Sequence, residues 1–519
     1  GGTFIDTCVG AANLSATPDL TSVTITPSGG GTPALIGAAT STEAGAMKPT
    51  DRVKSDLTVL LRDVGGDVGI DKTDFDAAVA EACEIVNQLV RKCLPIVLPE
   101  GENSINETLF LSSDGLPPST DIGEGAWQIV LRGAGNAHIQ TPRPPNIAAS
   151  RCASTIKWNG ATSAPMIHIH ASRRLIIENL CLDGRGTQNV ASHGILITSS
   201  DQSGEISQRN MIRDVEIFGF RSTWEEIATQ EKMIGIALVP SDFSGDPPYD
   251  TDVQIDSTVV KRVAIAAPRG FLGANGFTNG IVFEDVYLQY TDYGYWAEDS
   301  DLTVIGGFTG TWTRPIGAQA DAFETTLCEN ARAAILIGST SPNPAFQARS
   351  VQIYNHYGEI NCGLGVDTVA SDAPSEGTRR STFLSMGGVM AVGGGGQASA
   401  IRYDHWGTFA LLGTLVGTRN GEIMENGNIF LNPPSGGTLE YIVQEFGNAD
   451  LVTGPNTRHS LKLSRLDGSI SVPDQINASG TPDATTFLSG DSSWSIPELI
   501  EDTTPQLGGP LDADGNSIS

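Results

Sequence analysis

One short run of the chain gathers residue types that bind and cleave sugars. Residues 287–301 contain four of the nine tyrosines, one of the seven tryptophans and four acidic residues. Aromatic rings pack against the apolar faces of sugar rings, and carboxylates accept hydrogen bonds from sugar hydroxyls. The predicted glycan-binding residues in this run are Tyr290, Tyr293, Tyr295 and Trp296.

Three carboxylates of the same run, Asp292, Glu298 and Asp301, are the candidate catalytic residues. Glycoside hydrolysis uses two carboxyl groups about 5 Å apart for retention or about 6.5–9.5 Å apart for inversion. Residues i and i+2 of a strand share a face at about 6.5–7 Å, but Glu298 has this spacing to neither aspartate. A turn would have to bring a pair together. The run equally suits a turn with a stacked aromatic ladder and no catalytic role.

Two histidine-containing runs are weaker candidates. Tyr403-Asp404-His405-Trp406 adds Trp406 to the predicted glycan-binding residues, and its His–Asp pair could relay a proton or be purely structural. His168 and His170 share one strand face, but zinc needs three or four ligands. There is no phosphate-binding loop and no Gly-x-Ser-x-Gly elbow. We predict no metal and no cofactor.

Composition excludes several classes of partner. The 519 residues carry a net charge of −29 and no basic run, which disfavours nucleic acid and anionic membrane surfaces. No apolar stretch reaches the length of a membrane-spanning helix, so we predict no membrane insertion. With 60 glycines and 28 prolines, the chain is expected to be rich in strands and tight turns.

The seven cysteines are widely spaced and form no Cys-x-x-Cys motif. This pattern predicts buried reduced thiols rather than a disulfide framework or a zinc finger. It therefore predicts folding in a reducing compartment.

A six-residue pattern, apolar–polar–polar–apolar–any–apolar, occurs four times. The copies begin at Ile177, Ile212, Val260 and Phe283, and their fourth positions lie 35, 48 and 23 residues apart. The last interval fits one coil of a solenoid, and the others fit two coils or one coil with a long insertion. Irregular spacing with a preserved strand pattern predicts a right-handed parallel β-helix of roughly 13 coils.

One helix is predicted, over residues 73–92, with Thr73 or Asp74 as its cap and an apolar stripe at spacings of three and four. It would cover the open N-terminal end of the solenoid, where apolar side chains and strand edges are otherwise exposed. The predicted domains are an N-terminal fibre or adaptor segment at 1–55, the β-helix entry with its capping helix at 56–124, the parallel β-helix at 125–450, and C-terminal fibre repeats or a connector at 451–519.

Four segments resemble known families. Residues 71–79 together with Ile96-Val97-Leu98-Pro99-Glu100-Gly101 resemble the entry of pectate-lyase-like β-helix proteins, in which a capping helix precedes a strand ending in Leu-Pro-x-Gly. Residues 39–54, 486–494 and 501–512 resemble short motifs of bacteriophage tail fibres. The resemblance implies a phage tail fibre or tailspike, flanked by small β-rich fibre repeats and assembled as a homotrimer.

The resemblance also implies a location and a role. Such a chain is made in the host cytoplasm, becomes part of the virion tail, contacts other tail proteins and binds a bacterial surface glycan during adsorption. The alternative is a tailspike depolymerase that hydrolyses or eliminates surface polysaccharide, but no fixed motif marks its catalytic carboxylates. Binding is therefore favoured over catalysis. The fibre motifs argue against a cellular enzyme acting on pectin-like polymers.

The net charge of −29 makes stability depend on salt. Moderate salt screens the repulsion between carboxylates, so we expect the melting temperature to rise from low to moderate sodium chloride. Thermal unfolding followed by circular dichroism measures this. A melting temperature that falls over that range would contradict the prediction.

Overall fold

The fold was analysed in a computed structural model. It describes residues 13–16, 22–26, 34–37, 59–60, 75–79, 82, 93, 95–112, 128–134, 152–170, 172–184, 189–199, 207–218, 233–239, 254–273, 277–290, 292–298, 300–311, 332–338, 350–360, 363–369, 380–393, 399–420, 423–425, 427–435, 437–445, 449–459, 487–488 and 494–495.

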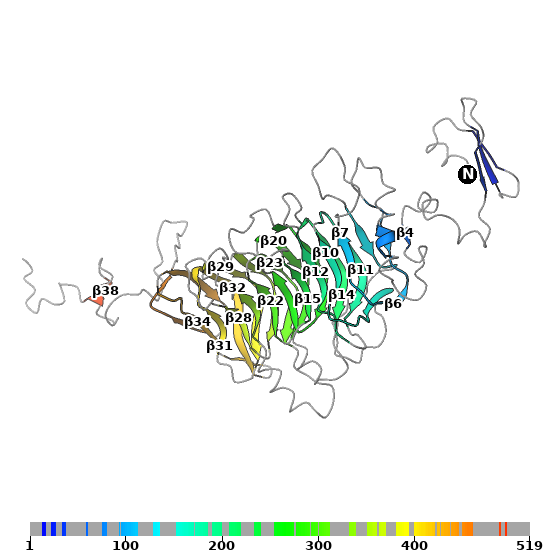
Figure 1. The fold of residues 1–519 in the computed structure, drawn as a ribbon. Coiled ribbons are helices and arrows are strands. Elements are labelled where there is room, and N and C mark those ends of the chain that lie inside the picture. The colour runs from blue at the N-terminus through cyan, green and yellow to red at the C-terminus, as the bar shows by residue number, and fades with distance from the viewer. Residues whose placement is uncertain are drawn as a thin grey trace, which may run out of the picture. The chain divides into compact units, whose positions relative to one another are not determined.

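One long parallel sheet, the first sheet, takes one strand from each coil. Its strands lie side by side in chain order (Figure 1) and pair in parallel throughout the described residues. They are β7 (Leu109–Ser112), β10 (Pro165–His170), β12 (His193–Thr198), β15 (Ile234–Leu238), β19 (Arg269–Gly273), β22 (Tyr293–Ala297), β25 (Ala333–Ile337), β28 (Leu364–Thr368), β31 (Ser399–Tyr403), β34 (Gly427–Leu431) and β36 (Ala449–Thr453). The described part of this sheet has 11 strands rather than the roughly 13 expected, because long connections lengthen several coils.

The rest of each coil forms a second sheet, bent in the middle. Three strands run through the bend: β11 (Ile176–Asp183), β14 (Met211–Phe218) and β32 (Trp406–Asn420). In five other coils the strand is interrupted at the bend, with one strand before it and one after it. These pairs are β17 (Val259–Lys261) with β18 (Ala264–Ala266), β20 (Phe277–Glu284) with β21 (Tyr287–Tyr290), β23 (Ser300–Ile305) with β24 (Phe308–Thr311), β26 (Ser350–Tyr354) with β27 (Tyr357–Ile360), and β29 (Arg380–Met386) with β30 (Val389–Gly393).

Shorter or terminal strands complete the second sheet. They are β4 (Val59–Leu60), β5 (Ile96–Val97), β6 (Gly101–Ile105), β8 (Val130–Arg132), β9 (Ser154–Trp158), β13 (Ser207–Gln208), β16 (Gln254–Asp256), β33 (Ile423–Glu425), β35 (Leu439–Glu445) and β37 (Thr457–His459). Parallel pairing within it begins where β4 meets β5. The chain is thus mainly β with long parallel sheets, as predicted.

The bend of the second sheet is a left-handed turn that recurs in register. Eight coils place one residue with a φ of 49–68° at this point: Asn179, Asp214, Arg262, Asp285, Gly306, Asn355, Gly387 and Gly413. Glycine, asparagine and aspartate adopt this conformation most easily. The backbone ladder continues through it, since the Asp285 N–H donates to the Ile305 carbonyl at 3.0 Å and the Gly306 N–H to the Tyr354 carbonyl at 2.8 Å.

The six-residue repeat is confirmed by the strand register. Ile177 pairs with Ile212, Ile212 with Val260, and Val260 with Phe283. Each interval is therefore one coil, and the longer two contain insertions. The left-handed turn occupies the third position of every copy. The first and sixth positions point into a core of fully buried isoleucine, leucine, valine and phenylalanine side chains.

The N-terminal part of the chain is described only in segments. Strands β1 (Asn13–Ala16), β2 (Ser22–Thr26) and β3 (Ala34–Gly37) form an antiparallel sheet. Residues 75–79 and 82 are helical, and Phe75, Ala78 and Ala82 are fully buried in the main core. The remainder of the predicted helix to residue 92, and the motif at 39–54, lie outside the described residues.

The chain divides into two compact units, Gly1–Arg458 and His459–Ser519. Within the second unit, β38 (Phe487–Leu488) pairs with β39 (Trp494–Ser495) in antiparallel fashion. The fibre-like segment 501–512 lies outside the described residues. Among the residues that the structure describes, no helix has the length and apolarity needed to cross a membrane.

The cysteines depart from the prediction of reduced thiols. Cys152 and Cys181 form a disulfide, with their Cα atoms 5.6 Å apart, and Cys93 is also disulfide-bonded. Wide sequence spacing concealed the first pair. It forms because β9 and β11 pair in register and bring residues 29 positions apart together.

The left-handed turns predict which glycines the fold needs. Gly388, just after the turn, has a φ of +85°, and a Cβ there would collide with the backbone carbonyl oxygen of His356. We expect Gly388→Ala to lower the free energy of unfolding by about 1–3 kcal/mol. The matched control is Gly358→Ala, whose Cβ would meet the flexible end of Ile360 at 3.3 Å and the backbone of Val389 and Met390 at ordinary contact distances of 3.6 and 3.9 Å. Urea unfolding compares the two, and equal losses would contradict the prediction.

Candidate functional site

The run at 287–301 is divided among three strands of two sheets. Tyr290 ends β21, Tyr295 lies in β22, and both rings are fully buried in the main core. Tyr295 packs edge-on against Phe283 with ring centroids 5.1 Å apart. Strand alternation turns these two rings inward, so a glycan on the surface cannot reach them in this structure.

Tyr293 and Trp296 lie outside the main core, on the first sheet. Tyr293 is 1% exposed and packs with Ala333, Leu336 and Leu364 in a separate apolar cluster, against which Trp296 also packs. The two rings meet edge to face at 5.3 Å, and the Trp296 indole N–H donates to the Gly338 carbonyl at 2.9 Å. Trp296 is only partly buried, whereas Tyr293 is buried.

Asp292 is held by two arginines. Its carboxylate lies 2.8 Å from Nε of Arg269 and 3.3 Å from Nε of Arg332. The Arg269 guanidinium also sits over the Tyr293 ring, 5.8 Å from its centroid. These two ion pairs tie the start of β22 to Arg269 and Arg332, so Asp292 serves as an anchor for this strand.

The three candidate carboxylates are distributed over different places. Asp292 and Glu298 flank the two ends of β22, and six residues of extended strand separate their Cα atoms by about 20 Å. Asp301 belongs to β23 of the second sheet, where its Oδ1 accepts the Ser350 N–H at 3.0 Å. Asp292 and Glu298 are therefore too far apart for the carboxyl spacing of about 5–9.5 Å that glycoside hydrolysis uses, and the Ser350 N–H already occupies one oxygen of Asp301.

Trp406 and His405 both make buried hydrogen bonds. His405 Nε2 donates to the Val369 carbonyl at 3.0 Å, so in a neutral ring Nδ1 accepts from the Ser381 hydroxyl at 2.9 Å. The Tyr403 hydroxyl then donates to Ser381 at 2.5 Å. Trp406 is 8% exposed, and its indole N–H donates to the Pro434 carbonyl at 2.9 Å. These contacts fix the turn between β31 and β32.

Three aromatic rings that we did not predict as a set stack on the outer face of the second sheet. Tyr287, Phe308 and Tyr357 are register partners on successive coils, and we call them the aromatic column. The Tyr287 and Phe308 ring centroids lie 4.5 Å apart at an interplanar angle of 13°, and those of Phe308 and Tyr357 lie 5.7 Å apart at 24°. Tyr357 is 39% exposed.

Polar groups accompany the aromatic column. Gln289 and Glu359 lie two residues beyond Tyr287 and Tyr357 on the same face of the sheet, and the Gln289 amide is 3.5 Å from the Tyr287 hydroxyl. Burial, and secondarily the charge of Glu359, raises the pKa of Tyr287. Its hydroxyl therefore stays protonated at neutral pH and can act as donor or acceptor.

An apolar column lies beside the aromatic one, across the left-handed turn. It consists of Ile305, Tyr354, Met386 and Leu412 in register. The same repeat position in the four preceding coils carries Glu178, Arg213, Lys261 and Glu284, which form ion pairs. All large hydrophobic residues that are exposed in the described part of the chain, Ile305 (41%), Tyr357 (39%) and Met386 (42%), lie in these two columns. We call the two columns together the lateral strip.

The aromatic column could have been predicted from the fifth position of the six-residue repeat. Tyr287 is the fifth position of the fourth copy, and Phe308 and Tyr357 are the fifth positions of the next two coils. Those coils escaped detection because Gly307 and His356 replace the apolar fourth residue, and Thr309 and Gly358 replace the apolar sixth.

His168 and His170 share one partner rather than a metal set. His168 Nε2 and His170 Nδ1 each lie 2.8 Å from the Thr198 hydroxyl oxygen. Burial, with a smaller contribution from His170, lowers the pKa of His168 to about 4. Burial, with a smaller contribution from His168, lowers the pKa of His193 to about 4. The imidazoles of His168 and His193 are therefore neutral at neutral pH.

Comparison with known proteins gives likeness in structure only. No family model and no curated protein matches the chain. A surface adhesin of Streptococcus pneumoniae, PfbA, is similar with a TM-score of 0.46 and 11% identity over 84% of this chain and 97% of that one.

Two further similar structures have different printed descriptions. A tailspike protein of Acinetobacter baumannii bacteriophage Fri1, a capsular polysaccharide depolymerase, has a TM-score of 0.37 and 11% identity over 86% of this chain and 63% of that one. The mannuronan C-5 epimerase AlgE4 A-module of Azotobacter vinelandii has a TM-score of 0.35 and 14% identity over 77% and 99%. All three TM-scores are below 0.5, so none of these likenesses assigns a function to this chain.

The lowered histidine pKa values predict acid sensitivity. Between about pH 6.5 and pH 4 the unfolded chain binds protons at His168 and His193 that the folded chain does not. Stability therefore falls as pH drops through this window, by about 1 kcal/mol per pH unit for each group. Urea unfolding at several pH values measures the slope, and His168→Gln should reduce it. An unchanged slope in the variant would contradict this assignment.

Proposed function

We propose that the chain is a phage tail fibre or tailspike protein that binds a bacterial surface glycan through the lateral strip of its β-helix. The observation that carries this proposal is the aromatic column, Tyr287, Phe308 and Tyr357, held in register on successive coils. Aromatic side chains with polar tips suit the amphipathic surface of a sugar chain. Gln289 and Glu359 add hydrogen-bonding groups along the same face.

Rigidity supports binding by this surface. Each ring lies on a strand that is hydrogen-bonded to another strand on both sides. The ring is therefore already ordered, and little conformational entropy is lost when a ligand binds. Successive strands lie about 4.8 Å apart, and the ring centroids follow at 4.5 and 5.7 Å. An extended polymer could therefore contact several coils at once, as a long surface polysaccharide requires.

A depolymerase is the alternative function, but the candidate carboxylates support it poorly. Asp292 is paired with two arginines and lies about 20 Å from Glu298 along the strand, and Asp301 of the second sheet already accepts the Ser350 N–H. Binding without cleavage is therefore the function that these residues favour. Incubation with host polysaccharide should then leave its length unchanged and create no new reducing or unsaturated ends.

The assembly belongs to the same proposal. The fibre-like motifs suit a homotrimer in the virion tail, in contact with other tail proteins, made in the host cytoplasm and used during adsorption. The high negative charge makes contact between copies costly except where charges are sparse. The lateral strip is such a region, so subunit contact is the competing use of this surface.

Tyr357→Ala tests the glycan site. Removal of the most exposed ring of the aromatic column should weaken binding to host surface polysaccharide about tenfold, equivalent to about 1.4 kcal/mol. Calorimetry or biolayer interferometry with the immobilised glycan measures this. The matched control is Phe430→Ala, which removes a half-buried ring from β34 of the first sheet and should leave binding unchanged.

Two outcomes would contradict the proposed site. Equal binding by Tyr357→Ala and the unmodified chain would show that the glycan binds elsewhere. A change of oligomeric state in Tyr357→Ala, seen by sedimentation with binding per chain retained, would assign the strip to subunit contact.

A further inference from the structure

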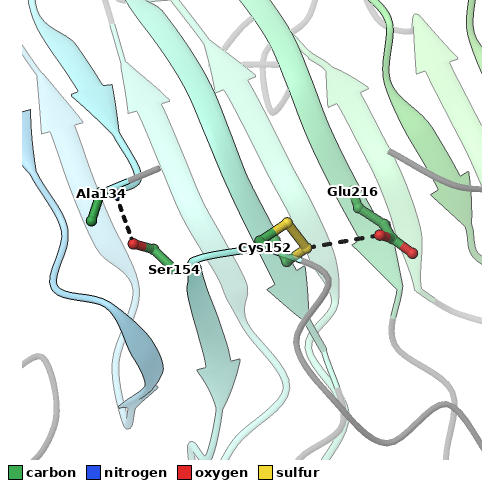
Figure 2. The surroundings of a disulfide bond; sticks show 5 residues. Ala134, Cys152, Ser154 and Glu216 are labelled. Atoms are coloured by element: carbon green, nitrogen blue, oxygen red, sulfur yellow. Dashed lines mark hydrogen bonds between the residues drawn. A yellow bond between two sulfur atoms is a disulfide. The ribbon is translucent and has the colours of Figure 1, made fainter. Parts of the chain in front are cut away.

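The disulfide between Cys152 and Cys181 lies beside a buried acid. Cys152, Cys181 and Glu216 are 3%, 1% and 4% exposed, and the Cys181 sulfur is 3.8 Å from Oε2 of Glu216 (Figure 2). One ligand atom from each of the three residues lies within 4.8 Å of the other two. All three stand on the second sheet or next to it, far in sequence from the lateral strip.

The strand register positions this cluster. Cys181 of β11 pairs with Glu216 of β14 on one side and with Thr155 of β9 on the other. Ser154 fixes the segment that carries Cys152, because its hydroxyl accepts the Ala134 N–H at 2.9 Å and donates to the Leu98 carbonyl at 3.3 Å. The three side chains therefore converge whether or not the sulfur atoms are bonded.

The contact between Glu216 and Cys181 differs between the two redox states. A thiol can donate its proton to the carboxylate, whereas a disulfide sulfur has no proton to donate. In the disulfide state the carboxylate of Glu216 thus faces sulfur that offers it neither a proton nor a positive charge. Once the two sulfur atoms are thiolates, a cation finds three negatively charged ligand atoms here within 4.8 Å of one another.

We propose that Cys152, Cys181 and Glu216 form a zinc site when the disulfide is reduced. Reduction adds two electrons and two protons to the sulfur atoms, supplied by a cellular dithiol that is itself oxidised to a disulfide. The two thiols then release their protons as the metal binds, because thiolates are the ligands. The site goes beyond the glycan-binding function and does not depend on it.

The ligand geometry suits zinc. Tetrahedral zinc with Zn–S of about 2.3 Å and Zn–O of about 2.0 Å places sulfur and oxygen about 3.5 Å apart, close to the 3.8 Å between Cys181 and Glu216. Only the two sulfur atoms must separate, to about 3.8 Å. Thr155, the register partner of Cys181, is 3% exposed, and its hydroxyl has no hydrogen-bond partner among the described residues. Its hydroxyl oxygen is the group that we assign to the fourth ligand position.

Metal analysis of the full chain tests the site. Protein reduced with a phosphine, which is oxidised to its phosphine oxide, is given zinc, passed into metal-free buffer without oxygen and analysed by plasma mass spectrometry. We expect about one zinc per chain that is lost on reoxidation. Cobalt substituted for zinc should show a thiolate-to-metal charge-transfer band that requires Cys152 and Cys181.

Variants separate this site from the other cysteines. Glu216→Gln should weaken zinc binding at least tenfold, and Cys152→Ser should abolish it. Glu359→Gln, which changes a partly exposed acid elsewhere on the second sheet, should retain the zinc. Circular dichroism of each variant checks that the β-helix is folded. A reduced, folded chain without zinc, or one whose zinc is unaffected by Cys152→Ser and Glu216→Gln, would overturn the proposal.

Discussion

The stacking of one left-handed turn on the next is the constraint on which the other features depend. Each turn bends the second sheet, and its N–H groups hydrogen-bond to the next coil, so every coil is held in one register. A shift of one residue would exchange the buried and exposed faces of a strand. Because the register is fixed, each repeat position forms a column, and a column can be charged in one part of the β-helix and apolar in another.

Because side chains can differ from coil to coil within a column, the lateral strip and the column of ion-paired residues have the same backbone geometry. The second repeat position carries Glu178, Arg213, Lys261 and Glu284 in four coils and then Ile305, Tyr354, Met386 and Leu412 in the next four. The first and sixth positions of the four repeat copies are buried in the core, whereas the second position and, from Tyr287 onward, the fifth position face outward and can serve the binding that we propose. The glycan surface that we propose is therefore a change of side chains on an unchanged scaffold.

The sequence was sufficient to predict the parallel coils but not the lateral strip. Apolar residues at the first, fourth and sixth positions revealed four copies, because burial allows few alternatives there, but whether the longer intervals held one coil or two stayed open until the strand register was known. The later copies were hidden by Gly307, His356 and Ser385, where the turn or a buried hydrogen bond replaces an apolar side chain. Alternation along a strand does not tell which face is inside, so Tyr290 and Tyr295 looked available for binding although both are buried. The Cys152–Cys181 contact depends on pairing between coils, which spacing along the chain does not reveal.

The central claim is that a fixed register builds a glycan-binding surface from the fifth-position aromatic rings. An experimental structure of the chain with a bound oligosaccharide from the host surface tests it most directly. The account predicts sugar rings along Tyr287, Phe308 and Tyr357, with hydroxyl contacts to Gln289 and Glu359. Sugar bound instead over Trp296 and Arg332 of the first sheet, or a second copy of the chain covering the lateral strip, would contradict it.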